Sequence, residues 1–250
     1  MLLNESGWSQ LSALPGLAAH HHYISTDSTN TCAKNIRILP SDQMILLTAL
    51  TQTCGKGQRS NTFFSSIPGN IYTSIICPVD DIGNHFHYNR SLCLAIAETL
   101  QNFLPDIPVS IKWPNDIYVH NKKICGILLE STPNSNLHIV LGFGINVNMQ
   151  QKDFPTELKN TATSLAIETG KTFSCPSLLT IIYTAFLNNL NCTPDILHPH
   201  YTSRLFRLGY NVRIAGHMGI FSGVMGDGRF VLNCNNEMMY FSSGSPEFLS

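Results

Sequence analysis

The chain has 250 residues and a formal charge of −1, because 15 lysine and arginine residues nearly balance 16 aspartate and glutamate residues. This length is sufficient to bury a sizeable core without disulfides or metal ions. An apolar share of 43% argues against disorder. The near-neutral charge excludes a protein that binds nucleic acid through a general excess of basic residues.

The sequence also indicates the compartment. The longest apolar run, around Met44 to Leu50, is far shorter than the roughly 20 residues that a membrane-spanning helix needs. No lysine or arginine precedes Lys34, so the charged start of a secretory signal peptide is missing. The eight cysteines form no Cys-x-x-Cys pair, which argues against disulfides and a protein-bound metal. We therefore expect a cytoplasmic protein without a membrane partner, and we interpret His20-His21-His22 as a solvated loop.

Hydrophobic patterns predict an α+β fold. We expect helices over residues 31–36, which follow a cluster of N-cap residues, and over 91–104, 163–169 and 177–190. Strand-like segments cover residues 43–51, 71–77, 110–113, 117–119, 124–130 and 137–147. After Gly209 the chain consists of short apolar runs separated by glycines. We therefore predict a mixed or antiparallel sheet flanked by helices over residues 1–208, followed by a small C-terminal β barrel over residues 209–250.

A glycine-bearing loop follows the first of these predicted strands. It places Lys56 between Gly55 and Gly57, with Arg59 two positions further on. Glycines allow the backbone to approach a ligand closely, and the two cations can offset the charge of a phosphate or carboxylate. The spacing fits neither the P-loop nor the dinucleotide fingerprint, so an ordinary surface loop is an equal alternative.

Two further features point to the same kind of ligand. Lys112 ends a predicted strand on the face opposite Ile111 and Trp113, although most lysines are simply solvated. Gly142 and Gly144 share one face of another strand, and glycines inside strands suggest that a ligand or another backbone lies against them. Gly126 invites the same interpretation, with bulges or close packing as the alternative. Missing hydrolase motifs argue against covalent and metal-hydrolytic catalysis. The cations, amides and exposed backbone together predict a site for an anionic small ligand.

Together these motifs resemble those of biotin protein ligases. The matching segments are Asp27–Asn30, Gln52–Asn61, Asn70, the Lys-Trp-Pro-Asn-Asp sequence at 112–116, Lys123–Glu130 and Gly142–Asn148. They span roughly residues 24–170, and Phe241–Ser245 is similar to the end of the C-terminal domain of that family. The resemblance implies that biotin and ATP, with Mg²⁺, form biotinyl-adenylate, from which biotin is transferred to a lysine of a carrier domain.

The resemblance also implies roles for individual residues. Lys112 and Asp116 are the implied catalytic residues, Asp116 either as a proton acceptor or as a support for the Lys112 turn. The implied biotin-binding residues are Ser28, Thr29, Asn30, Gln52, Gly55, Lys56, Gly57, Lys112 and Gly126. The implied nucleotide-binding residues are Lys56, Gln58, Arg59, Phe63, Asn70, Asn115 and Asn146. No metal-ligating residue is implied.

Three positions depart from the family pattern. Lys56 replaces the commoner arginine, Ser60 a glycine and Phe63 a tryptophan. Lysine cannot form the bidentate contact of arginine, and serine has less backbone freedom than glycine. We expect an active enzyme that retains the adenylate more weakly.

The expected partner is a biotin carboxyl carrier protein or domain. The segment before Asp27 is too short for a helix-turn-helix domain, so we expect no operator binding. An exposed sheet edge would allow a homodimer or would dock the carrier. Two alternatives stay open: a lipoate or octanoate ligase or transferase, which shares the architecture, and a biotin-binding module without catalysis.

Overall fold

The larger sheet of the protein has seven strands. The computed structural model describes residues 6–132 and 135–249. The strand order is β1-β2-β3-β7-β6-β5-β4; β1 runs parallel to β2, and all other neighbours are antiparallel. The strands are β1 (Leu17–Thr26), β2 (Met44–Gln52), β3 (Ile71–Pro78), β4 (Val109–Lys112), β5 (Asp116–Val119), β6 (Lys122–Thr132) and β7 (Ser135–Ile145). This arrangement confirms the predicted mixed sheet.

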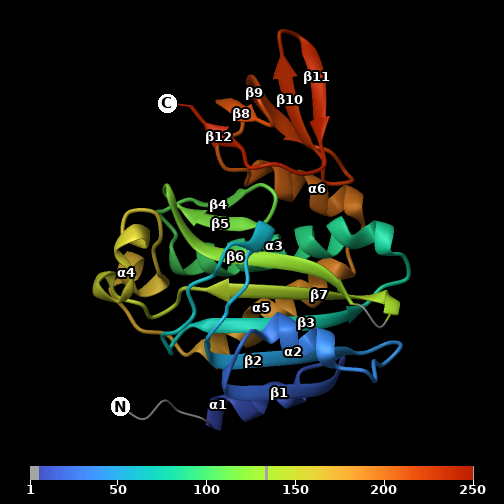
Figure 1. Cartoon of the computed structure of the whole chain (residues 1–250), viewed down its shortest axis with the longest axis vertical. Coiled ribbons are helices and arrows are strands. Elements are labelled where there is room, and N and C mark those ends of the chain that lie inside the picture. Colours follow the sequence, from blue (N-terminus) through green and yellow to red (C-terminus); the bar gives the residue numbers. More distant parts are fainter. Residues whose placement is uncertain (1–5, 133–134, 250) are drawn as a thin grey trace.

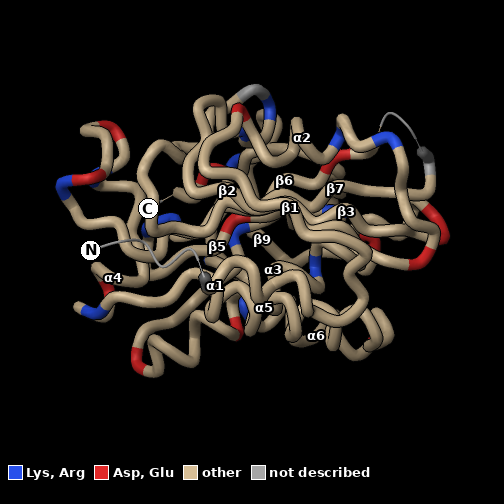
Figure 2. The backbone as a smooth tube through the Cα atoms, turned by 90° about the horizontal axis from the view of Figure 1, so that it is seen from below, with Lys and Arg blue, Asp and Glu red and all other residues tan. Residues whose placement is uncertain are grey.

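Helices cover both faces of this sheet unequally. Figure 2 shows α2 on one face and α1, α3, α5 and α6 on the other. The helices are α1 (Ser6–Ser9), α2 (Thr29–Asn35), α3 (His85–Phe103), α4 (Leu165–Thr169), α5 (Cys175–Leu190) and α6 (Pro194–Ser203). None of the helices within the described ranges is long and apolar enough to cross a membrane. The face with the single helix α2 leaves room for a site.

The main core lies between the sheet and the long helices. Leu92, Ile96 and Leu100 recur at helical spacing on α3 and are completely buried. They belong to one cluster with alternate strand residues such as Ile75 and Leu141. The opposite side of the sheet has a much smaller apolar cluster beneath α2. The sheet is therefore anchored by its helix-rich face.

A second, five-stranded sheet follows. It consists of β8 (Asn211–Ile214), β9 (His217–Val224), β10 (Phe230–Cys234), β11 (Glu237–Phe241) and β12 (Glu247–Phe248) in the order β11-β10-β9-β8-β12. The rings of Phe221 and Phe230 stack at 4.2 Å in its core. The predicted small β unit is confirmed, as the upper part of Figure 1 shows. Within the described residues β11 and β12 are the sheet edges and do not pair with each other, so no closed barrel is formed there.

The two sheets share contacts through the turn after β4. The indole nitrogen of Trp113 donates to the carbonyl oxygen of Gly228 at 2.8 Å, and its ring packs edge-on against Phe230. The backbone of Ile111 also forms hydrogen bonds with Arg204 and Phe206, in the segment that leads to the small sheet. One continuous buried cluster includes residues of both sheets. The boundary after residue 208 stays a prediction, and the small sheet fixes the Lys112 turn in place.

Three elements differ from the sequence-based prediction. The histidine triplet lies in the edge strand β1, not in a loop; its polar, exposed sequence hides the strand pattern. Helix α6 was not predicted because it contains Pro199 and few apolar residues. Helix α3 begins at His85 instead of Ser91, since its first turns are aromatic and polar.

The strand position of the histidines has a consequence for acid stability. His20 Nε2 and His22 Nδ1 each lie 2.8 Å from the hydroxyl oxygen of Thr48. Burial, followed by the neighbouring His22 and His21, lowers the pKa of His20 to about 4. The unfolded chain, with a histidine pKa of about 6.5, therefore binds a proton that the folded chain does not.

We expect the melting temperature to fall as the pH is lowered from about 6.5 towards 4. Thermal unfolding of the wild type and of His20→Gln across this range measures the effect, and the variant should lose less stability on acidification. Equal pH dependence of the two proteins would show that His20 does not contribute.

Candidate functional site

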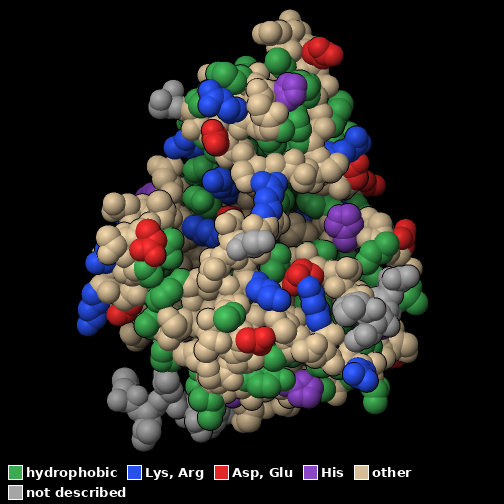
Figure 3. Space-filling model, viewed as in Figure 1, with side chains coloured by type: hydrophobic (Ala, Val, Ile, Leu, Met, Phe, Trp, Pro, Cys, Tyr) green, Lys and Arg blue, Asp and Glu red, His purple; other side chains and the backbone are tan. Residues whose placement is uncertain are grey.

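A polar pocket opens on the α2 side of the large sheet, below the C-terminal sheet. Figure 3 shows the hollow there, with basic side chains around it. Its wall is formed by the ends of β2 and β4, the first part of β6, the last part of β7, the first turn of α2 and the segment from Gly244 to Pro246. The sequence-predicted residues that line it are Ser28, Thr29, Asn30, Gln52, Lys56, Gly57, Gln58, Phe63, Lys112, Asn115, Asp116 and Gly126.

One end of the pocket is built from uncharged polar groups. The backbone nitrogen of Thr29 donates to Gln52 Oε1 at 2.8 Å, and the Thr29 hydroxyl lies 3.2 Å from the same oxygen. Because a backbone N–H can only donate, this contact fixes which end of the Gln52 amide is oxygen. Gln52 Nε2 has no hydrogen-bond partner within the described part of the chain, so it remains available to a ligand.

The opposite end carries two cations. Lys112 is half-buried at the end of β4, with its ammonium group 5.1 Å from the centre of the Tyr118 ring. Lys123 lies nearby and forms an ion pair with Asp116, with 2.6 Å between Nζ and Oδ1. The pocket lining includes both lysines. Burial lowers the pKa of Lys112; Asp116 opposes this shift, and Lys123 adds to it.

Asn115 holds the turn that carries Lys112. Its side-chain amide donates to the carbonyl oxygen of Ile127, and its own carbonyl oxygen accepts from the backbone nitrogen of Ile127 at 3.0 Å. The turn is thereby tied to the neighbouring strand β6. Lys112 also lines the same pocket as Gly142 and Gly144, so the predicted meeting of a strand-end lysine and a glycine surface is present.

Side chains, not another backbone, cover the glycine surface. A Cβ atom at Gly142 would lie 1.8 Å from Asn30 Oδ1, and one at Gly144 would lie 2.3 Å from the ring of Phe63. At Gly126 it would meet the end of Lys123 at 3.0 Å. The close-packing alternative therefore explains part of the glycine pattern. Because Gly126, Gly142 and Gly144 have no side chains, they also leave space on the pocket floor.

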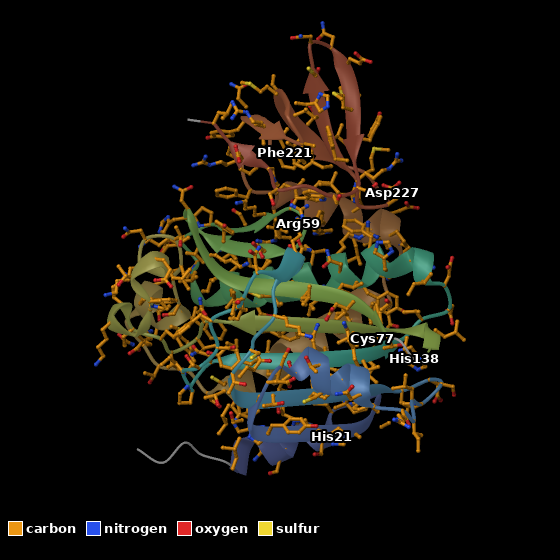
Figure 4. All side chains as sticks on the ribbon, viewed as in Figure 1. His21, Arg59, Cys77, His138, Phe221 and Asp227 are labelled. Atoms are coloured by element: carbon orange, nitrogen blue, oxygen red, sulfur yellow. The ribbon has the colours of Figure 1, made fainter. Side chains whose placement is uncertain are left out.

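The loop after β2 forms a thin wall of the pocket. Gly55 is required there, because a Cβ would lie 2.3 Å from Ser65 Oγ and 2.4 Å from the carbonyl oxygen of Phe63. Arg59 adopts a left-handed backbone conformation with φ of 53° and donates to Ser245 Oγ at 2.7 Å. Figure 4 shows Arg59 between the large sheet and the small sheet. Gly55 and Arg59 line an open hollow on the outer side of the loop, not the main pocket.

Two predicted asparagines also lie outside the main pocket. Asn70 Oδ1 accepts from the backbone nitrogens of Val147 and Asn148 at 2.8 and 3.2 Å, so its side chain supports the end of β7. Asn146 lines a second, more apolar cavity, which shares Phe63 and Lys123 with the main pocket. The side chain of Ser60 lies outside the described residues, so its effect on the loop stays a prediction.

Sequence analysis missed Lys123 and the Gly244–Pro246 segment as site residues. Lys123 lies in one of the matched motifs, but only the sheet register brings its ammonium group to Asp116. The C-terminal segment reaches the pocket because the small sheet docks on Trp113 and Gly244 packs against Ile214. The predicted hairpin of β5 and β6 could have indicated that Lys123 lies near Asp116. The local sequence of the Gly244–Pro246 segment does not indicate that it reaches the pocket.

Comparisons with known proteins find relatives of this sequence and of this fold. The model of the biotin/lipoate A/B protein ligase family matches residues 23–146. A bifunctional ligase/repressor BirA from Bacillus subtilis is 32% identical over 155 residues, which cover 61% of this chain and 47% of that protein. The chain thus spans about half of the length of this relative. A biotin–[acetyl-CoA-carboxylase] ligase from Mycobacterium tuberculosis is 26% identical, with 96% of this chain and 89% of that protein covered.

A solved structure shares most of the architecture. The biotin protein ligase from Aquifex aeolicus, determined in complex with biotin and ATP, superposes with a TM-score of 0.79 at 25% sequence identity. The superposition covers 93% of this chain and 99% of that chain. Both the large sheet and most of the C-terminal sheet therefore have counterparts in that protein.

Proposed function

We propose that the chain, whose residues 23–146 match the model of the biotin/lipoate A/B protein ligase family, is a biotin protein ligase. It forms biotinyl-adenylate from biotin and ATP, and then transfers biotin to a lysine of a carrier domain. The observation that carries this proposal is the pocket itself, in which an uncharged hydrogen-bonding end faces two lysines, Lys112 and Lys123. An elongated ligand with a polar head and an anionic tail fits this arrangement.

The first step joins two anions. A carboxylate oxygen of biotin attacks the α-phosphorus of ATP, the bond to the bridging oxygen breaks, and pyrophosphate leaves with that electron pair. Lys112 and Lys123 offset the negative charge that gathers on the α-phosphate oxygens in the transition state. Mg²⁺ arrives with ATP as part of the substrate, held by phosphate oxygens and water.

This role of Lys112 predicts a pH dependence. Only the ammonium form of Lys112 can offset the negative charge of the reactants, and burial lowers its pKa from the ordinary lysine value. The rate of adenylate formation should therefore fall as the pH rises through this lowered pKa. Pyrophosphate release measured from neutral to alkaline pH tests this, with Lys112→Arg as a comparison because arginine stays protonated. A decline at the same alkaline pH in both proteins would assign it to another group.

The nucleotide occupies the side of the pocket next to the second cavity. Phe63 and Asn146 line that cavity, whose apolar remainder suits an aromatic base. Lys56, Gln58 and Arg59 lie on the loop that separates the pocket from solvent and would follow the phosphates, with Asn115 at the turn. Closure of this loop would exclude water from the reactive anhydride.

The second step transfers biotin. The neutral amine of the acceptor lysine attacks the acyl carbon of the anhydride, a C–N bond forms, the bond from that carbon to the phosphate oxygen breaks, AMP leaves with its electron pair, and the nitrogen gives up one proton to a base or to water. Asp116 lines the same pocket and is a candidate to accept the proton of the acceptor amine. It is, however, already paired with Lys123 at 2.6 Å. This pairing favours Asp116 as the residue that orients Lys123.

The acceptor is proposed from one relative. The M. tuberculosis protein is named for acetyl-CoA carboxylase, and a biotin carboxyl carrier protein or domain of such an enzyme is the corresponding substrate here. We place the reaction in the cytoplasm, in keeping with eight free cysteines. Neither nucleic acid nor membrane is required by this proposal, and a homodimer through a sheet edge is compatible with it.

The experiment is a substrate comparison. The protein is incubated with ATP·Mg²⁺ and either biotin or lipoate; pyrophosphate is measured and bound adenylate is identified by mass. We expect pyrophosphate and a biotinyl-adenylate with biotin only. Turnover with lipoate and not with biotin would show that lipoate is the substrate. Biotin binding without release of pyrophosphate or AMP, even with a carrier domain present, would indicate a binding module without catalysis.

A further inference from the structure

A chain of buried hydrogen bonds runs from the surface to the polar end of the pocket. It begins at Lys34, which forms an ion pair with Glu130. Glu130 Oε2 accepts from Asn30 Nδ2 at 2.9 Å. Asn30 Oδ1 lies 2.6 Å from the hydroxyl of Ser74, which in turn lies 2.7 Å from the hydroxyl of Thr29. Glu130 does not line the main pocket but lines the outer hollow beside Lys56, and its hydrogen bonds reach the polar end of the pocket along this chain.

The donors and acceptors along this chain have one consistent direction. A carboxylate can only accept, so Glu130 forces the amide nitrogen of Asn30 towards itself and the amide oxygen towards Ser74. Asn30 is 3% exposed, and leaving its oxygen without a donor would be costly. The single hydrogen of the Ser74 hydroxyl is therefore directed to Asn30.

The direction of Ser74 determines that of Thr29. With its hydrogen given to Asn30, the Ser74 oxygen must accept across the 2.7 Å contact, so the Thr29 hydroxyl donates to it. Gln52 Oε1 is still satisfied by the backbone nitrogen of Thr29. Thr29 then presents a hydroxyl acceptor to the pocket, while Gln52 Nε2 presents a donor.

We propose that Glu130, held by Lys34, is a positioning residue that fixes Thr29 as a hydrogen-bond acceptor and thereby selects a ligand whose head carries an N–H beside a carbonyl. This inference rests on the proposed function, since the cyclic urea of biotin has this pairing and the dithiolane ring of lipoate has neither group. Without Glu130 the Asn30 amide nitrogen keeps only the long contact of 3.5 Å to the carbonyl oxygen of Leu128, so the amide can reverse and Thr29 becomes a donor.

Glu130→Ala tests this role. Its KM and dissociation constant for biotin should rise by about tenfold, as the loss of a charge-assisted bond predicts. Its KM for ATP and its kcat should change by less than about twofold, because the reacting groups lie at the other end of the pocket. Glu130→Gln keeps an acceptor for Asn30 and should remain within about threefold of the wild type. Glu157→Ala removes an exposed glutamate and is the matched control.

A second variant covers the case in which Glu130→Ala does not fold. Ser74→Ala interrupts the same chain with the loss of one oxygen, and it should raise the KM for biotin by a similar factor. The double variant should be no weaker than the weaker single variant, because both act through one chain. Unchanged biotin affinity in folded Glu130→Ala or Ser74→Ala would overturn the inference, as would equal effects on the KM for biotin and for ATP. Failure of the wild type to bind biotin would instead overturn the proposed function on which it rests.

Discussion

Replacing Lys112 with alanine is expected to lower the rate of biotinyl-adenylate formation by about 10²- to 10³-fold. The ammonium group lies in the pocket at the end of β4, where the biotin carboxylate and the α-phosphate must approach each other. Without it, Lys123 is the remaining lysine at this end of the pocket, and its own charge is shared with Asp116. The substitution removes a half-buried side chain at a strand end, so the fold should persist.

Single-turnover formation of the adenylate measures this loss directly. Lys152→Ala removes an exposed lysine outside the pocket and provides the control for a general change of charge. Melting temperatures of both variants should lie within a few degrees of the wild type. A Lys112→Ala protein that forms the adenylate at the normal rate would leave Lys123 as the cation that supports the first step.

Much of the fold could be predicted because its core follows simple periodicities. The apolar stripe of α3 and the strands β2, β3, β6 and β7 were evident from spacing alone. Elements whose residues are not apolar were missed, and β1 and α6 are the examples. The edge strand β1 buries little, and its pairing with β2 depends on backbone groups that carry no sequence signal.

The site could be predicted in part for a different reason. Motifs near chain turns, such as 112–116 and 27–30, keep their residues together, and the structure brings both segments to one pocket. Asn70 is instead engaged in holding the end of β7, where its amide oxygen serves two backbone nitrogens. Lys123 and the Gly244–Pro246 segment depend on sheet register and on the docking of the second sheet, which local sequence does not determine.

Gly142→Ala is expected to be the most damaging of the single-methyl changes at the three glycines of the pocket floor, Gly126, Gly142 and Gly144. The new Cβ would lie 1.8 Å from Asn30 Oδ1 and 2.6 Å from its Cγ. Asn30 cannot yield without leaving both Ser74 and Glu130, since it is almost completely buried between them. We expect the free energy of unfolding to fall by about 3 kcal/mol, because overpacking adds to the loss of buried hydrogen bonds.

Biotin affinity should fall with it, by at least about 100-fold, because Thr29 and Asn30 share the first turn of α2 and move together. Denaturant unfolding and equilibrium biotin binding measure the two effects. Gly144→Ala is the informative comparison: the three atoms nearest to its Cβ would all belong to the ring of Phe63, a partly exposed loop side chain that can turn away. That variant should keep most of its stability and its biotin affinity while binding ATP more weakly. If Gly142→Ala kept its stability and its biotin affinity as well as Gly144→Ala, Asn30 would be free to move, and the close contact at Gly142 would not matter for function.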